Sequence, residues 1–271
     1  MACCSTLNDD YFEGFITFFY SLRKHNPGFN CPYYIFTWGD LSQQNIDTLK
    51  TIYSSFIFKH TDNDLYNKCQ YTNDIRKWNI NCNNRFDIFT LEEYDKAIFF
   101  DADMLCLGDI TDLFNINVSF GACTITKGSE LDHPGRDNKH IKSFDGGLMV
   151  ISKKYLTKKT REDLLEIAHQ KKWSSDEPIL NVYFDNIKTT FLPKKYNTLT
   201  SELTVPLLHD AKIIQFIDSK KPWFSGNIHD KYTDYVIKKI GYKLVVKIDK
   251  IFNEYFKNAK KQYNISNSSS R

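Results

Sequence analysis

Apolar residues recur at helical spacing in three segments of the first hundred residues. Residues 9–25, 42–56 and 85–94 each predict a helix. Asn8 can cap the first of these helices and Ser42 the second, because both side chains can accept a hydrogen bond from a free backbone N–H. The apolar faces of the first two helices are formed by Phe12, Phe15, Phe19 and Leu22, and by Ile46, Leu49, Tyr53 and Phe56.

Short apolar runs lie between these helices and predict strands at residues 2–7, 33–38 and 96–100. Alternation of strands and helices is typical of a mostly parallel sheet covered by helices on both faces. Ligands of such α/β folds bind beyond the carboxyl ends of the strands. The pattern therefore predicts a functional site just after residue 100.

The second half continues the α/β pattern without a Pro/Gly/Ser-rich linker, so we expect a single catalytic domain over residues 1–258. Residues 259–271 are polar and of low complexity, which predicts a disordered tail. Helices are expected at residues 160–170 and 177–184, and strands at residues 148–152, 189–192, 212–216 and 243–248.

Composition narrows the class of protein. The chain has 271 residues, of which 41% are hydrophobic and 25% charged, and these values are ordinary for a globular domain. A net charge of +3 is too small to favour nucleic-acid binding. The seven cysteines lack the spacing of zinc ligands. No apolar run is long enough to span a membrane, and the first residues are too polar for a signal peptide. We expect a cytoplasmic protein without a membrane segment.

Two aspartates, Asp101 and Asp103, end the apolar run of residues 96–100. Carboxylates beside a buried strand are costly unless a cation meets them. Two carboxylates that converge could hold a hard divalent ion such as Mn²⁺ or Mg²⁺. Alternatively, the pair could make only turn and helix-cap hydrogen bonds. The two residues alone leave both interpretations open.

Other candidate residues lie before and after this pair in the sequence. Arg85 precedes Asp101 by 16 residues, and "FDGGLMV" contains Gly146 and Gly147, where backbone can approach a ligand closely. "SSDEPILN" places Asp176 and Glu177 at a helix start, where acids also suit the helix dipole. "IIQFIDSKKPW" follows at residues 213–223 and ends in Lys-Pro-Trp.

This ordered set resembles the glycogenin-like retaining glycosyltransferases of family 8, from about Asn8 to Trp223. The resemblance implies a GT-A nucleotide-sugar fold in which Asp101 and Asp103 bind Mn²⁺ (or Mg²⁺). Gln215 stands where the family has a third metal ligand, usually His. The resemblance also implies that Lys221 and Arg85 contact the diphosphate of a UDP-sugar.

The remaining donor contacts are likewise implied by the resemblance. Leu7, Asn8 and Tyr11 in "TLNDDY" would form the uridine site, although Tyr11 taken alone suggests an aromatic on a helix surface. Asp218 replaces the glycine of the family's late motif, which brings a negative charge near the phosphates. The other residues expected to contact the nucleotide sugar are Ala102, Asp132, Asp145, Gly146, Gly147, Asp176 and Glu177.

The expected activity is retaining transfer of a hexose, glucose or galactose, from a UDP-sugar to a separate hydroxyl of a glycan or protein-linked glycan. Asp176, Glu177 and Arg85 are the catalytic candidates, and we favour front-face attack by the acceptor over a covalent intermediate. Residues 197–216, which match the segment that carries the self-glucosylated tyrosine of glycogenins, contain no tyrosine. A homodimer is also expected from the resemblance. The alternatives are a weakened UDP-sugar-binding protein and a metal-dependent nucleotidyltransferase.

Overall fold

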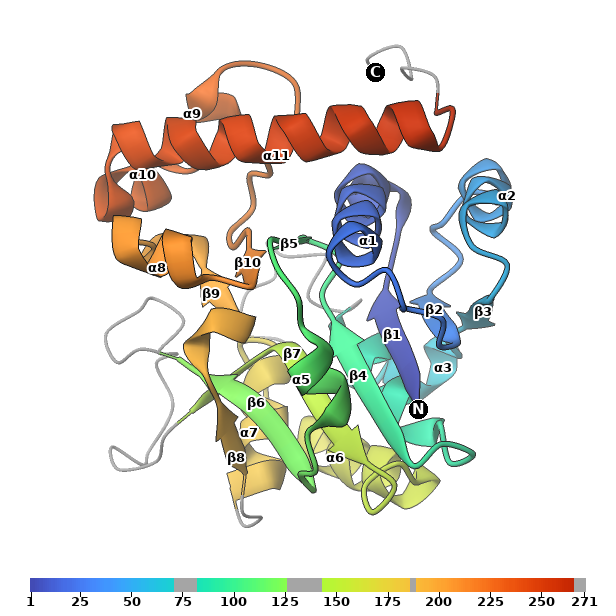
Figure 1. Cartoon of the computed structure of the whole chain (residues 1–271). Helices are drawn as coiled ribbons and strands as arrows, with labels where there is room; N and C mark the ends of the chain where they lie inside the picture. The colour runs from blue at the N-terminus through green and yellow to red at the C-terminus, as the bar shows by residue number, and fades with distance from the viewer. Residues whose placement is uncertain (71–81, 126–142, 186–188, 266–271) are drawn as a thin grey trace.

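A seven-stranded sheet in the order β3-β2-β1-β4-β7-β6-β8 forms the centre of the protein. We analysed a computed structural model that describes residues 1–70, 82–125, 143–185 and 189–265 (Figure 1). Four of the six pairings are parallel, and the two that involve β7 with β4 and β6 are antiparallel. The seven strands are β1 Ala2–Thr6, β2 Tyr33–Thr37, β3 Phe56–His60, β4 Lys96–Phe100, β6 Phe120–Thr124, β7 Phe144–Ser152 and β8 Thr190–Leu192.

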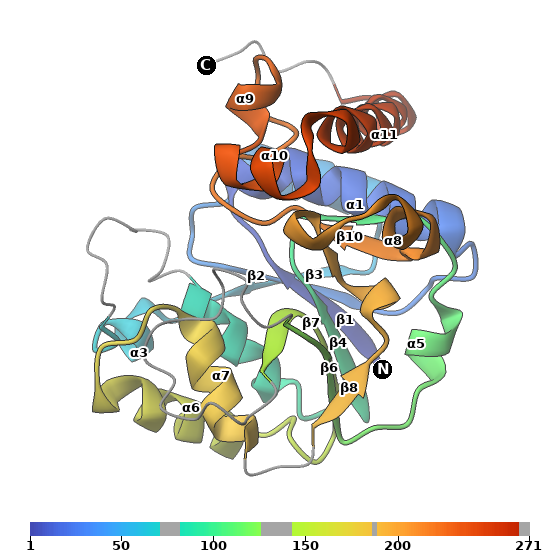
Figure 2. The same ribbon diagram turned by 90° about the vertical axis from the view of Figure 1, so that its left-hand side faces the viewer.

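Helices cover both faces of this sheet, as Figures 1 and 2 show. One face carries α1 (Phe12–His25), which follows the short 3-10 helix η1 (Asp9–Tyr11), and α2 (Gln43–Ile52). The other face carries the 3-10 helix η2 (Cys82–Thr90), α6 (Lys158–Gln170) and α7 (Asp176–Asp185). Because both faces of the central strands are buried, these strands are almost continuously apolar, as predicted.

The C-terminal segment forms an outer layer over α1. It contains α9 (Ile228–Lys231), α10 (Asp234–Ile240) and the long α11 (Tyr242–Gln262), which contacts α1 and crosses over it (Figures 1 and 2). The remaining helices are α3 Asn63–Tyr66, α5 Thr111–Asn115, α8 Val205–Asp210, and the 3-10 helices η3 Lys194–Tyr196 and η4 Thr200–Glu202. No helix among the described residues has the length and apolar character that a membrane span requires.

A second, three-stranded sheet in the order β5-β10-β9 sets the position of the candidate site. It consists of β5 Met104–Cys106, β9 Thr198–Leu199 and β10 Ile213–Gln215. β10 runs antiparallel to β5, so that Gln215 lies opposite Met104, the first residue after Asp103. This pairing brings residues more than 100 positions apart to the carboxyl end of β4.

Several predicted elements are corrected by the structure. α2 ends at Ile52, and Phe56, expected on its apolar face, begins the strand β3. The expected strand at residues 243–248 is instead part of α11. Residues 259–262, expected in a disordered tail, belong to the same helix, and Ala259 is fully buried. The predicted caps are confirmed, because the side chain of Asn8 accepts from Tyr11 N and that of Ser42 from Asn45 N.

Candidate active site

The turn of residues 101–103, here called the aspartate turn, joins β4 to β5. Its backbone is hydrogen-bonded to β7 and to the residue that follows β10. Asp101 N donates to Gly147 O in β7 at 2.8 Å, and Phe216 N, just after β10, donates to Asp103 O at 2.8 Å. Asp103 is 8% exposed and Ala102 is 6% exposed. The two aspartates therefore lie at the carboxyl end of a buried strand, as the sequence predicts.

Asp101 is paired on both carboxylate oxygens. Arg85 Nη2 donates to Oδ1 at 2.9 Å, and Gln215 Nε2 donates to Oδ2 at 2.8 Å. Burial raises the pKa of Asp101 to about 7; Arg85 opposes this rise, whereas the neighbouring Asp103 adds to it. Asp101 is thus paired with Arg85, one of the two cationic side chains predicted to lie at this site.

Asp103 meets the other cation on one oxygen only. Lys221 Nζ donates to Asp103 Oδ2 at 2.7 Å and to Phe216 O at 2.5 Å, and Lys221 is 2% exposed. Burial lowers the pKa of Lys221, but the charges of Asp103, Tyr11 and Asp101 raise it above its ordinary value, so this side chain is a cation. The second oxygen, Asp103 Oδ1, is buried without a hydrogen-bond partner.

Two glycines of β7 make room for the side chains that reach this turn. A Cβ on Gly147 would lie 2.3 Å from Gln215 Oε1, and a Cβ on Gly146 would lie 2.5 Å from Arg85 Nη1. Neither position could carry a larger residue without moving these groups. Gln215 Oε1 is itself buried and without a hydrogen-bond partner.

Arg85 links the aspartate turn to the N-terminus of α7. Its Nη1 lies 3.2 Å from Asp176 Oδ2, and its guanidinium lies 4.9 Å from the ring centre of Phe99. Burial raises the pKa of Asp176 despite Arg85. Glu177 Oε1 accepts from Gly146 N at 3.3 Å. The three catalytic candidates, Asp176, Glu177 and Arg85, therefore lie together.

Asp145 is fixed by two donors at the same edge of the sheet. Its Oδ1 accepts from Gly147 N at 2.7 Å and from Asn197 Nδ2 at 2.7 Å. Burial and the charge of Glu177 raise the pKa of Asp145 to about 8. Asn197 was not among the predicted residues; it is a single polar residue before the two-residue strand β9, and no local pattern distinguishes it.

The N-terminal residues expected at the uridine meet the late Lys-Pro-Trp motif. The rings of Tyr11 and Trp223 lie 5.7 Å apart, edge to face, and Lys221 Nζ lies 5.5 Å from the ring centre of Tyr11. Trp223 Nε1 donates to Asp10 O at 2.9 Å. Leu7 is buried at the end of β1, and Asn8 caps η1, so both lie beside this contact.

Asp218, expected to contact the nucleotide sugar, is held by other protein groups. The carboxylate of Asp218 accepts from Ser219 N at 2.8 Å and from Thr233 Oγ1 at 2.6 Å, so it is engaged by protein groups. Asp132 lies outside the described residues.

The donor set at the turn suits a hard cation. Within the described parts of the chain, no group of three or more His, Cys, Asp or Glu is arranged to hold a metal. Asp101 and Gln215 nevertheless meet at this turn through the bond from Gln215 Nε2, and Asp103 Oδ1 and Gln215 Oε1 are buried oxygens without a partner among the described residues. Oxygen ligands of this kind are those that Mn²⁺ and Mg²⁺ prefer.

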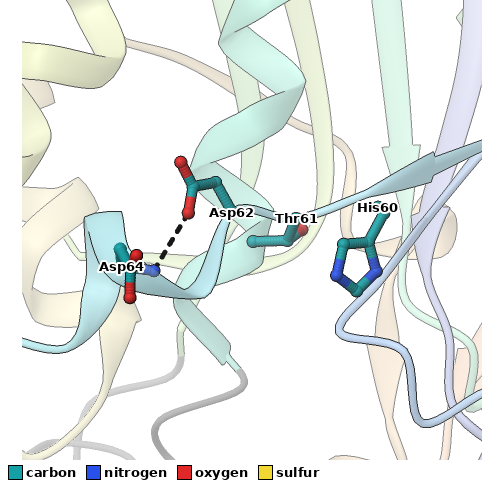
Figure 3. A pocket seen from close by; sticks show the side chains of 4 residues that line it. All are labelled: His60, Thr61, Asp62 and Asp64. Atoms are coloured by element: carbon teal, nitrogen blue, oxygen red, sulfur yellow. Dashed lines mark hydrogen bonds between the residues drawn. The ribbon is translucent and has the colours of Figure 1, made fainter.

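A separate hollow lies beyond the end of β3. It is lined by His60, Thr61, Asp62 and Asp64, and Asp62 Oδ1 accepts from Asp64 N at 3.0 Å within it (Figure 3). None of the predicted site residues that the structure describes lines this hollow. We therefore assign the candidate site to the aspartate turn.

Known proteins resemble this chain in sequence and in fold. The lipopolysaccharide 1,2-glucosyltransferase of Escherichia coli strain K12 is 26% identical over 168 residues, which cover 53% of this chain and 48% of that protein, so the match spans about half the relative's length. The galactosyltransferase LgtC, solved with donor and acceptor sugar analogues, superposes with a TM-score of 0.67 over 95% of this chain and 96% of its own, at 17% identity.

The glycosyltransferase GlyE of Streptococcus pneumoniae TIGR4 superposes with a TM-score of 0.60 over 95% of this chain and 64% of its own, at 18% identity. These likenesses establish the GT-A fold expected from the sequence. The model of the family described as "Glycosyl transferase family 8" matches residues 2–226. Since this match covers most of the sequence, the chain belongs to glycosyl transferase family 8.

Proposed function

We propose that this chain transfers a hexose, glucose or galactose, from a UDP-sugar to a hydroxyl of a separate glycan acceptor with retention, and that it requires Mn²⁺ or Mg²⁺. One observation carries the proposal. The aspartate turn faces two cationic side chains, Arg85 and Lys221, and two buried oxygens at the site, Asp103 Oδ1 and Gln215 Oε1, have no hydrogen-bond partner in the part of the chain that the structure describes. This arrangement suits a divalent cation and a diphosphate together.

Asp101, Asp103 and Gln215 would hold the cation. When bound, the ion would neutralise charge on the donor's diphosphate. Both oxygens of Asp101 accept from protein donors, but a carboxylate has about four lone-pair sites and can accept further. Gln215 supplies a neutral oxygen where the family usually has His, and Gly147 leaves the space that this side chain needs.

Lys221 is the group that we propose stabilises the departing UDP. Its ammonium has three N–H donors, and two are used by Asp103 Oδ2 and Phe216 O. The third can donate to a phosphate oxygen and balance the negative charge that develops as the sugar leaves. Leu7, Asn8 and Tyr11 would receive the uridine beside it.

The acids at the start of α7 support positioning rather than nucleophilic roles. Asp176 is paired with Arg85, and Glu177 accepts from Gly146 N. Asp145, Gly146 and Gly147 would flank the sugar at the same edge. We therefore propose front-face attack, in which the acceptor hydroxyl enters on the side from which UDP leaves and these side chains orient the two substrates. The sugar passes through an oxocarbenium-like state.

The acceptor class is drawn from the relatives. The Escherichia coli relative is described as a glucosyltransferase of lipopolysaccharide, and the LgtC structure contains donor and acceptor sugar analogues. We propose a glycan or protein-linked glycan acceptor for this chain and no self-glucosylation, since residues 197–216 contain no tyrosine.

A panel of UDP-sugars with Mn²⁺, scored by UDP release, tests the proposal. Asp103→Asn should abolish the release, whereas Asp95→Asn, which alters a side chain that is 91% exposed, should leave it unchanged. Turnover of nucleoside triphosphates without sugar transfer would favour a nucleotidyltransferase. UDP binding that Mn²⁺ does not strengthen, without donor turnover, would favour a weakened binding protein.

A further inference from the structure

The loop of residues 216–221, here called the lysine loop, connects the candidate metal ligand Gln215 to Lys221. It closes on itself, because Lys221 Nζ donates to Phe216 O at 2.5 Å. The turn passes through Asp218, whose backbone φ is 81°, in the left-handed region that side chains rarely adopt. Among described non-glycine residues only Asn264 shares a positive φ. A glycine would be the inexpensive residue here.

Hydrogen bonds of the Asp218 carboxylate offset the strain. Oδ1 accepts from Ser219 N at 2.8 Å, inside the loop. Oδ2 accepts from Thr233 Oγ1 at 2.6 Å, and Thr233 is the N-cap of α10. The first bond stabilises the turn itself, and the second ties it to the C-terminal layer.

Two further contacts hold the lysine loop from neighbouring elements. Lys220 Nζ donates to His229 O in α9, and Ile217 N donates to Thr200 Oγ1 in η4 at 3.2 Å. The lysine loop is therefore hydrogen-bonded to α9, to the N-cap of α10 and to η4, while its last residue, Lys221, donates to Asp103. Any change in its backbone would move the ammonium of Lys221 relative to the aspartate turn.

We propose that Asp218 and Thr233 form a latch that couples the C-terminal layer to the candidate active site by fixing the lysine loop, and so positions Lys221 for the donor diphosphate. Both are positioning residues, because their side chains engage protein groups and would reach the donor through Lys221. The consequence for nucleotide binding rests on the proposed function, whereas the consequence for loop order does not.

The test compares four full-length variants with wild type. Asp218→Gly removes the latch and also the backbone strain. Asp218→Asn can keep the bond to Ser219 N, but it replaces the charged oxygen that accepts from Thr233 by a neutral NH2, so the charge-assisted bond is lost. Thr233→Val removes the hydroxyl, and Thr233→Ser restores it. Hydrogen exchange of peptides that cover residues 216–223, measured without ligand, reports loop order. Titration with UDP and Mn²⁺ reports the effect on binding.

The latch predicts faster exchange in residues 216–223 for Asp218→Gly, Asp218→Asn and Thr233→Val, and wild-type exchange for Thr233→Ser. All three of these variants lose the charge-assisted bond between Thr233 and residue 218, and this loss alone predicts UDP affinity roughly 5- to 20-fold weaker. Unchanged exchange in Asp218→Gly and Asp218→Asn would overturn the latch. If wild type binds no UDP, the proposed function fails while the exchange measurement still decides the latch.

Discussion

Gly147→Ala is the substitution whose effect follows most directly from the structure. The new Cβ would lie 2.3 Å from Oε1, 2.6 Å from Nε2 and 2.7 Å from Cδ of Gln215, so one amide group would have to move as a unit. Gly147 lies inside β7 without a positive φ, so its backbone accepts alanine. The whole cost therefore arises from displacing Gln215.

Overpacking of this kind costs roughly 1–3 kcal/mol, and the displaced amide would also lose its 2.8 Å hydrogen bond to Asp101, about 1 kcal/mol more. We expect an unfolding free energy lower by roughly 2–4 kcal/mol. Since Gln215 is a proposed ligand, the gain in UDP affinity on adding Mn²⁺ should also shrink. Urea unfolding and calorimetric titration of UDP with and without Mn²⁺ measure the two effects.

Gly28→Ala provides the matched control, because a Cβ there meets nothing within 4 Å. It should leave both measurements close to wild type. The double variant Gly147→Ala with Gln215→Ala removes the clash, so it should regain part of the stability without regaining the response to Mn²⁺. A Gly147→Ala protein with wild-type stability and an unchanged Mn²⁺ response would refute the reasoning.

Four further outcomes are expected. Asp145→Asn keeps an acceptor for Gly147 N and Asn197 Nδ2. Because the pKa of Asp145 in the folded protein is raised from 3.8 to about 8, wild type should lose stability relative to this variant as pH rises from about 4 to about 8. Urea unfolding should therefore show a small difference in unfolding free energy between the two proteins at pH 5 and a large one at pH 8.5. Arg85→Lys cannot reach both Asp101 and Asp176, so donor turnover should fall by roughly tenfold, measured as UDP release. Chelation with EDTA should abolish that release in wild type, and restored activity on adding Mn²⁺ is the check. Incubation with UDP-glucose should leave tryptic peptides of the chain unmodified in mass spectra, and stoichiometric glucosylation of any tyrosine would contradict a separate acceptor.

The place of the aspartate turn could be predicted from sequence because its cause is local. An apolar run that ends in two acids gives a buried strand followed by a polar turn, and β4 ends at Phe100 as expected. The caps Asn8 and Ser42 are equally local, since a side chain and a backbone N–H two or three residues away decide them.

The prediction of a strand at residues 243–248 is wrong because six residues are too few to distinguish the helical period of about 3.6 residues from the strand period of two. "KLVVKI" is apolar enough for a strand, but the buried positions continue at helical spacing over the whole of α11. They are Leu244, Val245, Ile248, Asp249, Phe252 and Ala259. A window of twenty residues would have favoured a helix.

The roles of Gly146 and Gly147 depend on contacts that no local pattern encodes. That these glycines let backbone approach a ligand stays a prediction, and the structure adds that a Cβ on either would meet Arg85 or Gln215, which are about 60 residues before and 70 residues after them in the sequence. Asn197 is a similar case, since its role is defined only by its bond to Asp145. Such residues become visible once the sheet brings distant segments together.

The balance of charges at the aspartate turn supports the proposal that a metal cation binds there. Five carboxyl groups converge at this edge of the described structure, and they belong to Asp101, Asp103, Asp145, Asp176 and Glu177. Among the described residues, the cationic side chains paired with them are Arg85 and Lys221, and burial raises the pKa of three of the acids. A nucleotide diphosphate would add negative charge to a site that already has more acidic than cationic side chains. In the proposed function, a divalent cation at Asp103 Oδ1 and Gln215 Oε1 would relieve both repulsions at once, which is the physical reason why donor and cation would bind together.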